Sequence, residues 1–256
     1  MEDMQSMNHN NFILSSTSSM LGDVVSATSG VGFGIETYPI CDYVMQSVFL
    51  KMTGALEQKM KCISWEMATN DYEYRYFRYS QNPLGECSSY KEKKEIYKDL
   101  VDQISKFKNE AFDPHSIGRT NILNESSMQV KNSFMGSNLM VWAQKGFNEY
   151  QEIWSAVSEK YFVHDKNNLF TNKSNLPRMG STKKSLDEIY TDHLYRHRNR
   201  VAHNTFSYQQ NLPTLNTLVG GGYVYDNYFV YFSILILIDN IFIKLFEEYL
   251  RSLEDF

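Results

Sequence analysis

Arginines and histidines gather in one short stretch of the chain, residues 196–205, which reads RHRNRVAHNT. Three arginines and two histidines fall within eight residues of it, although the formal net charge of the whole chain is −5. Val201 and Ala202 lie inside the cluster, an arrangement that a purely solvated basic patch does not require. Arginine presents a planar, permanently charged fork that matches phosphate oxygens, and histidine titrates near neutral pH. The residue types therefore suit acid–base chemistry on a phosphate ester.

RNA is a phosphate ester on which such residues can act, because RNA carries its own nucleophile, the ribose 2′-OH. Cleavage then needs a group that takes the proton of this hydroxyl, a proton donor for the leaving 5′-oxygen, and positive charge near the reacting phosphorus. His203 is the candidate general acid/base and Arg198 the candidate phosphate clamp. This chemistry needs no metal ion or cofactor, and the sequence has no dense carboxylate cluster of the kind that holds two metals.

The spacing of Arg198 and His203 adds a geometric constraint. Five residues correspond to about 140° of rotation on an ideal α-helix, so the two side chains do not share a helix face. One solution is a helix that ends or distorts near His203, with Asn204 as its C-terminal cap residue. The other is a pair of chains whose two motifs complete one groove. We predict a homodimer on this ground and on the excess of apolar residues in the last helix.

The bulk properties of the chain favour a globular, intracellular protein. Of its 256 residues, 42% are hydrophobic and 21% charged, which is ordinary for a soluble protein. Cys41, Cys62 and Cys87 are too few and too scattered for a disulfide framework or a zinc knuckle, so we expect a reduced, cytoplasmic setting. The N-terminus begins with acidic residues and has only a short apolar run, which is not typical of a secretory signal.

Residues 229–246 form the one stretch that could suggest a membrane span. Asp239, Asn240 and Lys244 interrupt it, and its unbroken apolar part is too short to cross a bilayer. We therefore predict a buried core helix and no membrane partner.

Apolar residues recur at helical spacing along most of the chain, which predicts an all-α bundle with long loops. Residues 1–36 are rich in Ser, Asn, Gly and Met without a sustained period, so we predict a loosely ordered segment there and a single domain over 37–256. Ser185 followed by Glu188 has the spacing of a capping box and predicts the start of the helix that carries the cluster. The predicted helices cover residues 40–67, 91–112, 126–162 with a break at Gly136 or Gly146, and 184–203, with a buried final helix from Asp226. Polar loops are predicted at residues 164–182 and 204–222, and no β-hairpin is evident.

Three other stretches have a functional and a structural interpretation. SGVGFG, residues 29–34, resembles a glycine loop, but no strand precedes it and no P-loop lysine follows, so a phosphate-binding role is disfavoured. In YEYRYFRYS, residues 72–80, aromatic residues alternate with arginines, a pattern that can stack nucleic-acid bases. We favour an amphipathic helix there with its rings in the core. The lysine run KEKK, residues 91–94, is predicted to be a solvated face.

The segment Arg198-Asn199-Arg200-Val201-Ala202-His203 is similar to the signature of the HEPN superfamily of helical ribonucleases and nucleic-acid-associated proteins. The order of a long first helix, a later motif helix and a strongly apolar last helix also resembles that family. The resemblance implies a HEPN-like helical bundle and a metal-independent endoribonuclease that cleaves single-stranded RNA or an RNA loop. It further implies a homodimer, with Arg198 and His203 as catalytic residues and Asn199 orienting the site.

The same resemblance suggests a toxin or antiviral-defence effector, with an antitoxin or sensor protein as a further partner. Arg196, His197 and Arg200 are candidate substrate-binding residues around the motif. The alternative is a non-catalytic HEPN-type homodimer that binds RNA, a nucleotide or a protein.

His193 and His197 are four residues apart, which is a metal-ligand spacing, and Glu188 or Asp192 could add a carboxylate. No His-Glu-x-x-His pattern or nearby cysteine pair supports this zinc alternative, so no metal ligand is predicted. Glu57, on the first long helix, is a candidate polar partner of the motif. We favour the simpler interpretation, a solvated glutamate with Lys61 four residues later.

Overall fold

The computed structural model describes residues 9–32, 34–156, 162–165, 167–170, 184–203 and 225–254. Over these residues the chain is mostly helical, which confirms the predicted all-α class. Residues 9–14 are helical, and the labelled helices are α2 (Ser19–Thr28), α3 (Tyr38–Asn70), α4 (Tyr72–Tyr76), α5 (Tyr90–Lys108), α6 (Arg119–Phe134), α7 (Met140–Ala156), α8 (Leu186–Ile189), α9 (Tyr195–His203) and α12 (Tyr228–Glu254). Short 3-10 turns cover Ile35–Thr37 and Pro114–Ile117, and π-helical turns cover Phe77–Gln81 and Tyr190–Leu194.

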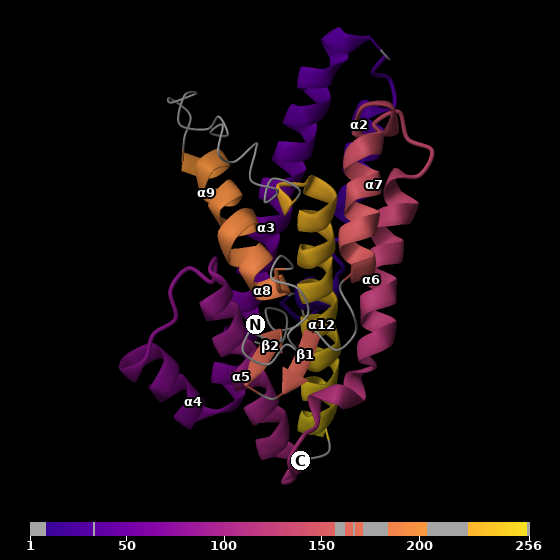
Figure 1. Cartoon of the computed structure of the whole chain (residues 1–256). Helices are drawn as coiled ribbons and strands as arrows, with labels where there is room; N and C mark the ends of the chain where they lie inside the picture. The colour runs from indigo at the N-terminus through magenta and orange to yellow at the C-terminus, as the bar shows by residue number, and fades with distance from the viewer. Residues whose placement is uncertain are drawn as a thin grey trace.

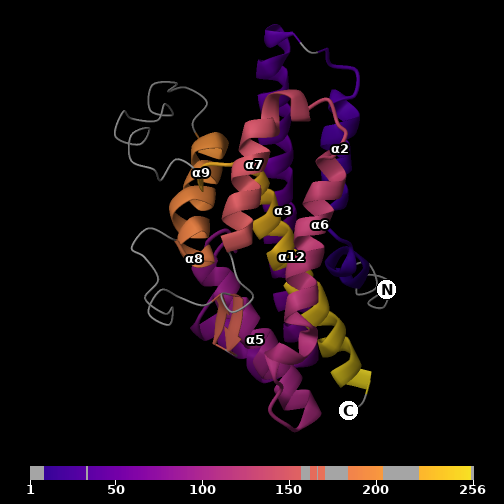
Figure 2. The same ribbon diagram turned by 45° about the vertical axis from the view of Figure 1, so that its right-hand side comes forward.

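Helix α12 runs through the centre of the bundle, between α3 on one side and α6 and α7 on the other (Figures 1 and 2). It is apolar on nearly every side, and a helix of that kind must be covered all round. Its residues from Phe229 to Phe242 are all buried, which confirms the predicted core helix. Among the described residues it is the one helix long and apolar enough to cross a membrane, but 89% of its most apolar window is buried inside the bundle.

Helix α3 is the long first helix that the sequence predicts. Pro39 lies in its first turn, where a proline fits because the missing N–H has no helical partner. A stripe of side chains at three- and four-residue spacing is buried along its length: Met45, Phe49, Met52, Leu56, Met60, Ile63 and Met67. Helix α3 packs on α12, and it also contacts α5 and α9.

The boundaries of the middle helices follow local signals. Ser89 and Glu92 form a capping box at the start of α5, and Asn109, with φ of 54°, ends it in the left-handed conformation earlier than predicted. Of the two predicted breaks in the next helix, the one at Gly136 occurs, with φ of 79° between α6 and α7. Gly146 lies inside α7.

The N-terminal segment differs from the loosely ordered segment predicted for residues 1–36. Over the described residues 9–32 it is largely helical, and Ile13, Leu21 and Val24 are fully buried. The backbone N–H and hydroxyl of Thr17 donate to Asp239 Oδ2 at 2.7 and 2.9 Å, and Lys59 Nζ pairs with Asp239 Oδ1 at 2.6 Å. A buried carboxylate needs such partners, so the segment is fixed by contacts that no local period reveals.

A small hairpin corrects the prediction that the chain has none. Strands β1 (Phe162–Asp165) and β2 (Asn168–Phe170) pair antiparallel, with Phe162 opposite Phe170. Phe170 is buried and stacks on the ring of Tyr90 in α5, at 5.6 Å between centroids. The start of the predicted polar loop, from residue 164, is therefore part of a packed hairpin. The rest of that loop, residues 171–182, and the loop predicted at 204–222 lie outside the described residues.

The helix that carries the arginine–histidine cluster is continuous from Leu186 to His203, through α8, a π-helical turn and α9. The capping box between Ser185 and Glu188 is present, which confirms the predicted start. Helix α9 is described as far as His203, and the predicted cap residue Asn204 lies outside the described residues. Helix α9 lies against the middle of α3 (Figure 1).

Candidate active site

Arg198 projects from α9 onto α3, where it meets Glu57. Its Nη2 lies 3.1 Å from each carboxylate oxygen of Glu57, and its Nη1 donates to Asn199 Oδ1 at 3.2 Å. The side chain of Arg198 is 21% exposed and that of Glu57 is 13% exposed. An arginine has five N–H donors, and these contacts with described residues engage only Nη1 and Nη2. The guanidinium is therefore oriented by Glu57 and Asn199 while still reaching solvent.

The favoured interpretation of Glu57, a solvated residue paired with Lys61, is wrong. Lys61 Nζ instead lies 2.5 Å from Glu86 in the connection before α5. Helical spacing brings Glu57 and Lys61 near each other, but it cannot show which side chain of another element approaches each one. The packing of α9 on α3 gives Glu57 the other role that the sequence allows, that of polar partner to the motif.

Lys93 is a buried cation near this pair that the sequence analysis missed. The run KEKK was predicted to be a solvated face, yet Lys93 is 1% exposed. Its Nζ donates to the carbonyl oxygens of Cys87 and Ser88 at 2.6 and 3.1 Å and lies 5.4 Å from the centre of the Tyr190 ring. Burial lowers the pKa of Lys93 to about 8, the nearby Glu57 carboxylate opposes this, and Arg198 adds to it. Helical spacing could have predicted the burial of Lys93, because Lys93 precedes the buried Ile96 and Tyr97 by three and four residues and so lies on their face of the helix.

His197 packs among aromatic rings between α9, α3 and α12. Its Nε2 lies 2.9 Å from the hydroxyl of Tyr228, and its ring lies 5.3 to 5.5 Å from those of Phe49, Tyr228 and Tyr231. Burial, assisted by the charge of Arg200, lowers the pKa of His197 to about 4. The structure thus packs His197 as a neutral ring, and the substrate-binding role predicted for it stays a prediction.

His193 is held by a polar network on the side of the same helix. Its Nδ1 lies 2.9 Å from Asp226 Oδ1, and its Nε2 lies 2.9 Å from Lys184 Nζ. An ammonium group can only donate, so Nε2 accepts from Lys184 and Nδ1 donates to Asp226. Tyr231 also donates to Asp226 Oδ1, at 2.8 Å. Both ring nitrogens of His193 are therefore engaged, and across the described part of the chain no group of three or more metal-ligating side chains meets.

The two flanking arginines of the cluster lie in different surroundings. Arg196 is exposed, with its Nη2 3.7 Å from Asp192 Oδ1 one turn earlier. Arg200 is partly exposed, and its charge acts on His197 and Asp226. Both remain candidates for contact with a polyanion.

His203 completes the motif in sequence, but only its backbone is described, as the last residue of α9. Its side chain and Asn204 lie outside the described residues. Because α9 is α-helical over Tyr195–His203, the expected offset of about 140° between Arg198 and His203 applies. The structure therefore brings together Arg198, Asn199 and Glu57, and the position of the His203 imidazole stays a prediction.

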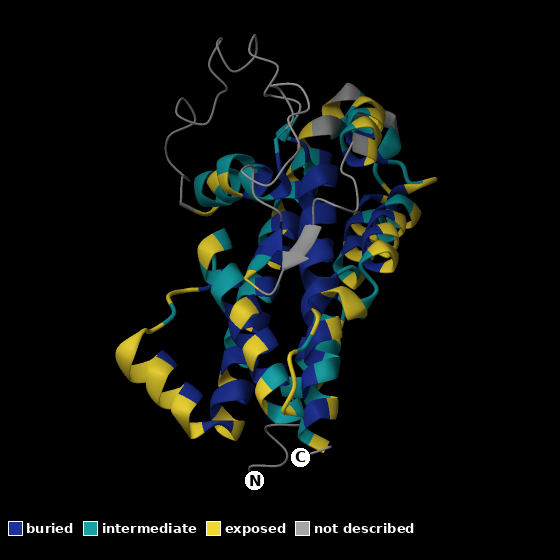
Figure 3. Ribbon diagram, turned by 60° about the horizontal axis from the view of Figure 1, so that its bottom comes forward, coloured by how far each residue is buried: buried dark blue, intermediate teal, exposed yellow. Residues whose placement is uncertain are grey.

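The favoured interpretation placed the aromatic rings of the stretch 72–80 in the core, but all of them except Tyr74 are exposed. This stretch forms α4 and the π-helical turn that follows it, together called the α4 arm (residues 72–81), which protrudes from the bundle in Figure 1 and is mostly exposed in Figure 3. Tyr74 is buried, and the aromatic side chains that remain exposed are Tyr72, Tyr76, Phe77 and Tyr79. The arginine Arg78 is pulled inward instead, to a buried ion pair with Asp99.

Comparison of the chain with models of known protein families, with curated proteins and with solved structures found no match. The resemblance to the HEPN superfamily therefore rests on the motif in α9 and on the order of the helices.

Proposed function

We propose that this chain is a metal-independent endoribonuclease of the HEPN type, acting on single-stranded RNA or on an RNA loop. The observation that carries the proposal is the setting of Arg198. Glu57 and Asn199 orient its guanidinium at the edge of α3, and His203 follows five residues later on the same helix. A preoriented, partly exposed guanidinium is suited to bind a phosphate in two-point geometry.

In this mechanism the ribose 2′-OH attacks the adjacent phosphorus, and the bond from phosphorus to the 5′-oxygen breaks. His203 takes the hydroxyl proton and, as the imidazolium so formed, gives a proton to the leaving 5′-oxygen, while Arg198 stabilises the charge on the phosphate oxygens. Glu57 acts through Arg198 as a positioning residue. The products are a 2′,3′-cyclic phosphate and a 5′-hydroxyl end. DNA lacks the 2′-OH and should resist cleavage.

We propose that the active form is a homodimer, because positions 198 and 203 are about 140° apart around a regular helix. Exposed apolar surface on the last helix no longer supports this, since α12 is buried within one chain. Mixing the inactive variants Arg198→Ala and His203→Ala tests the shared site. If each site takes Arg198 from one chain and His203 from the other, mixed dimers contain one intact site and regain activity. Mixed dimers that form but stay inactive would refute the shared site.

The activity test is incubation of the purified protein with single-stranded RNA in EDTA, followed by mapping of the RNA ends. His203→Ala should slow cleavage about 10²-fold or more and leave RNA binding nearly unchanged, because it removes only proton transfer. His193→Ala is the matched control on the same helix and should have a much smaller effect. The mechanism is wrong if EDTA abolishes cleavage while His203→Ala does not.

A cytoplasmic toxin or antiviral-defence effector is the biological role that we propose for this nuclease, on the motif resemblance alone. An antitoxin or sensor protein would then control it. Cell growth on expression of the chain tests this role: the wild-type protein should be toxic and the His203→Ala variant harmless. Co-expression of a candidate antitoxin gene should restore growth.

A second candidate is a non-catalytic homodimer that binds RNA, a nucleotide or a protein. One observation favours it: Glu57 already balances the charge of Arg198. If the purified chain binds single-stranded RNA and does not cleave it, this second candidate is established.

A further inference from the structure

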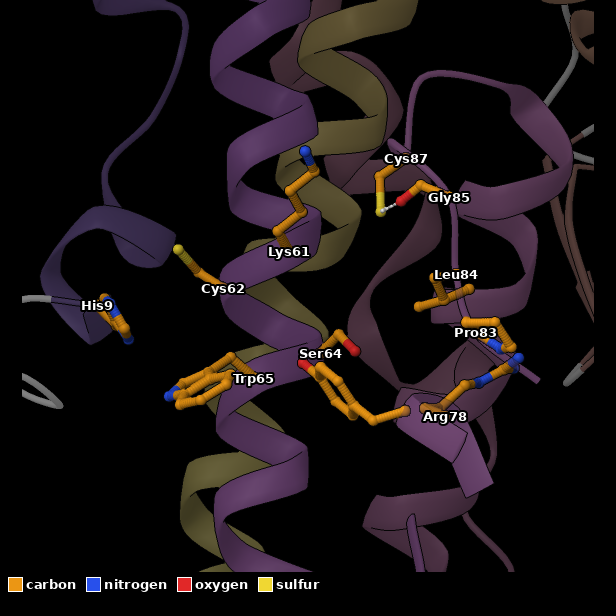
Figure 4. Close-up of a pocket in the computed structure, with 11 residues that line it drawn as sticks. His9, Lys61, Cys62, Ser64, Trp65, Arg78, Pro83, Leu84, Gly85 and Cys87 are labelled. Carbon is orange, nitrogen blue, oxygen red and sulfur yellow. Dashed lines mark hydrogen bonds between the residues drawn. The ribbon is translucent and has the colours of Figure 1, made fainter. Parts of the chain in front are cut away.

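A pocket of about 410 Å³ lies over the C-terminal half of α3, between the helix at residues 9–14 and the end of the α4 arm (Figure 4). Its volume is within the range of small-molecule sites, roughly 300–1,000 Å³. Lys61, Cys62, Ser64 and Trp65 form its floor on α3, and Tyr79 forms part of its wall. The pocket is separate from the Arg198–Glu57 pair.

The pocket displays two large rings that the fold leaves exposed. Trp65 is 55% exposed and Tyr79 is 50% exposed. The two rings meet edge to face, at 6.1 Å between centroids and 84° between planes. Exposed side chains of this size cost solvation free energy, and a cluster of them commonly marks a binding surface. A flat ring entering the pocket could stack on one of these rings and meet the edge of the other.

The charges around the pocket favour an uncharged flat ligand over a phosphate. Each basic side chain that lines it has an acidic partner: Lys61 pairs with Glu86, Arg78 with Asp99, and His9 Nδ1 lies 2.9 Å from Glu66 Oε1. A free anion would therefore have to compete with carboxylates already in place. A nucleobase needs no such charge, because stacking depends on its π-face.

The wall that carries Tyr79 is rigidly supported. The neighbouring Arg78 is 4% exposed, and its Nε and Nη2 each donate to a different oxygen of Asp99 at 2.6 Å. This two-point ion pair anchors the π-helical turn to α5. A preoriented ring loses less side-chain entropy on binding than a mobile one.

Two of the α3 residues that line the pocket, Lys61 and Ser64, lie on the same side of α3 as Glu57 in the candidate active site. Glu57, Lys61 and Ser64 are at positions i, i+4 and i+7, which share one helix face. At 1.5 Å per residue, Ser64 is about 10 Å along the helix from Glu57. A single strand of a few nucleotides can cover that distance.

We propose that this pocket binds an unpaired nucleobase of the RNA strand whose scissile phosphate lies at Arg198, with Trp65 and Tyr79 as its stacking rings. The proposal rests on the proposed ribonuclease function. In it, the RNA strand lies along α3, from the pocket that binds the base to the phosphate at Arg198.

Binding of a short, labelled single-stranded oligodeoxyadenylate to the full chain tests the pocket by fluorescence anisotropy. This probe lacks the 2′-OH, so the proposed mechanism cannot cut it. Trp65→Ala and Tyr79→Ala should each weaken binding by about 5- to 150-fold, the effect of losing one base–aromatic stack. Trp65→Phe should keep most of the affinity, because it keeps a ring.

Tyr72→Ala is the matched control, since Tyr72 is an exposed ring on the α4 arm that does not line the pocket. It should bind like the wild type, and circular dichroism and thermal melting should confirm that all variants fold. Unchanged affinity in both Trp65→Ala and Tyr79→Ala overturns the proposal. Equally tight binding of a duplex of the same length also overturns it, because a paired base cannot enter.

Cleavage kinetics separate this proposal from the function on which it rests. Trp65→Ala should raise KM for a longer RNA by the same factor as its binding loss, with kcat unchanged, and should leave a dinucleotide unaffected. If the chain cleaves RNA and Trp65→Ala changes neither KM nor binding, the pocket proposal fails and the function stands. If the chain never cleaves RNA but binding depends on Trp65, the function fails and the pocket stands.

Discussion

Two arginines of this protein face an acidic side chain across a helix interface. The two pairs differ in how many guanidinium nitrogens bond to the carboxylate and in how deeply the guanidinium is buried. Arg78 donates from Nε and Nη2 to Asp99 at 2.6 Å, contacts Glu95 at 3.3 Å and is almost fully buried. Arg198 contacts Glu57 through a single nitrogen at 3.1 Å and keeps part of its surface in solvent.

The difference separates a structural charge from an available one. The charge of Arg78 is enclosed, so its donors serve only the anchoring of the α4 arm. Arg198 is oriented by a weaker pair and can exchange or add a ligand at modest cost. Arginine content alone therefore says little about function, and the number of donors left accessible says more.

The largest expected effect is on stability at the buried pair. Asp99→Ala should lower the free energy of unfolding by about 3–5 kcal/mol, because it leaves Arg78 charged and buried without its partner. Glu57→Ala should cost about 1 kcal/mol, since its pair is closer to solvent. Urea unfolding monitored by circular dichroism measures both. Equal losses for the two variants would remove the distinction between the pairs.

The next largest expected effect is the pH dependence of stability that arises from His197, the neighbour of Arg198 in the sequence. Its pKa is lowered to about 4 in the folded state, so the unfolded chain binds more protons between pH 6.5 and 4. Stability should therefore fall as the pH drops through this window, by about 3 kcal/mol from this group. His197→Phe should flatten that part of the profile. A variant that loses stability with acid as steeply as the wild type would show that other groups cause the loss.

A smaller effect separates the two arginines by activity. Arg198→Lys should slow RNA cleavage by about 10- to 100-fold, because one ammonium cannot copy the fork that binds phosphate oxygens. Its stability should stay near that of the wild type. Arg78→Lys should do the reverse, with reduced stability and nearly normal kcat below its melting temperature. Full activity of Arg198→Lys would mean that Arg198 is not the phosphate clamp.

The smallest effect concerns the charge of Glu57. Glu57→Gln keeps an acceptor for Arg198 and removes the opposing charge, so RNA binding should tighten a few-fold at low salt. The gain should fade as salt rises, and stability should change by less than about 1 kcal/mol. Binding titrations at several salt concentrations measure this. A large loss of kcat at unchanged KM would instead indicate that Glu57 itself transfers a proton.

Periodicity and end signals in the sequence predicted much of the fold. The long helix α3, the capping box at Ser185, the break at Gly136 and the enclosed final helix all depend on nearby residues, and each is present. The exposed rings of the α4 arm and the buried Lys93 were predicted wrongly. In both cases local pattern gave the period of the segment, while the neighbouring elements decided which side faced the interior.

The candidate site shows the same division. The sequence by itself determined that Arg198, Asn199 and His203 lie on one helix, because their spacing and the signal for the start of the helix are local. Only the tertiary structure decided that Glu57, 141 residues away, faces Arg198, that Lys61 turns to Glu86, and that His197 packs as a neutral ring. Contacts between elements depend on how α9 packs on α3 and α12, and several pairings of the same charges satisfy the helical pattern equally well. The packing of the helices decides which of these pairings forms, because a charge buried by that packing needs a partner within contact distance.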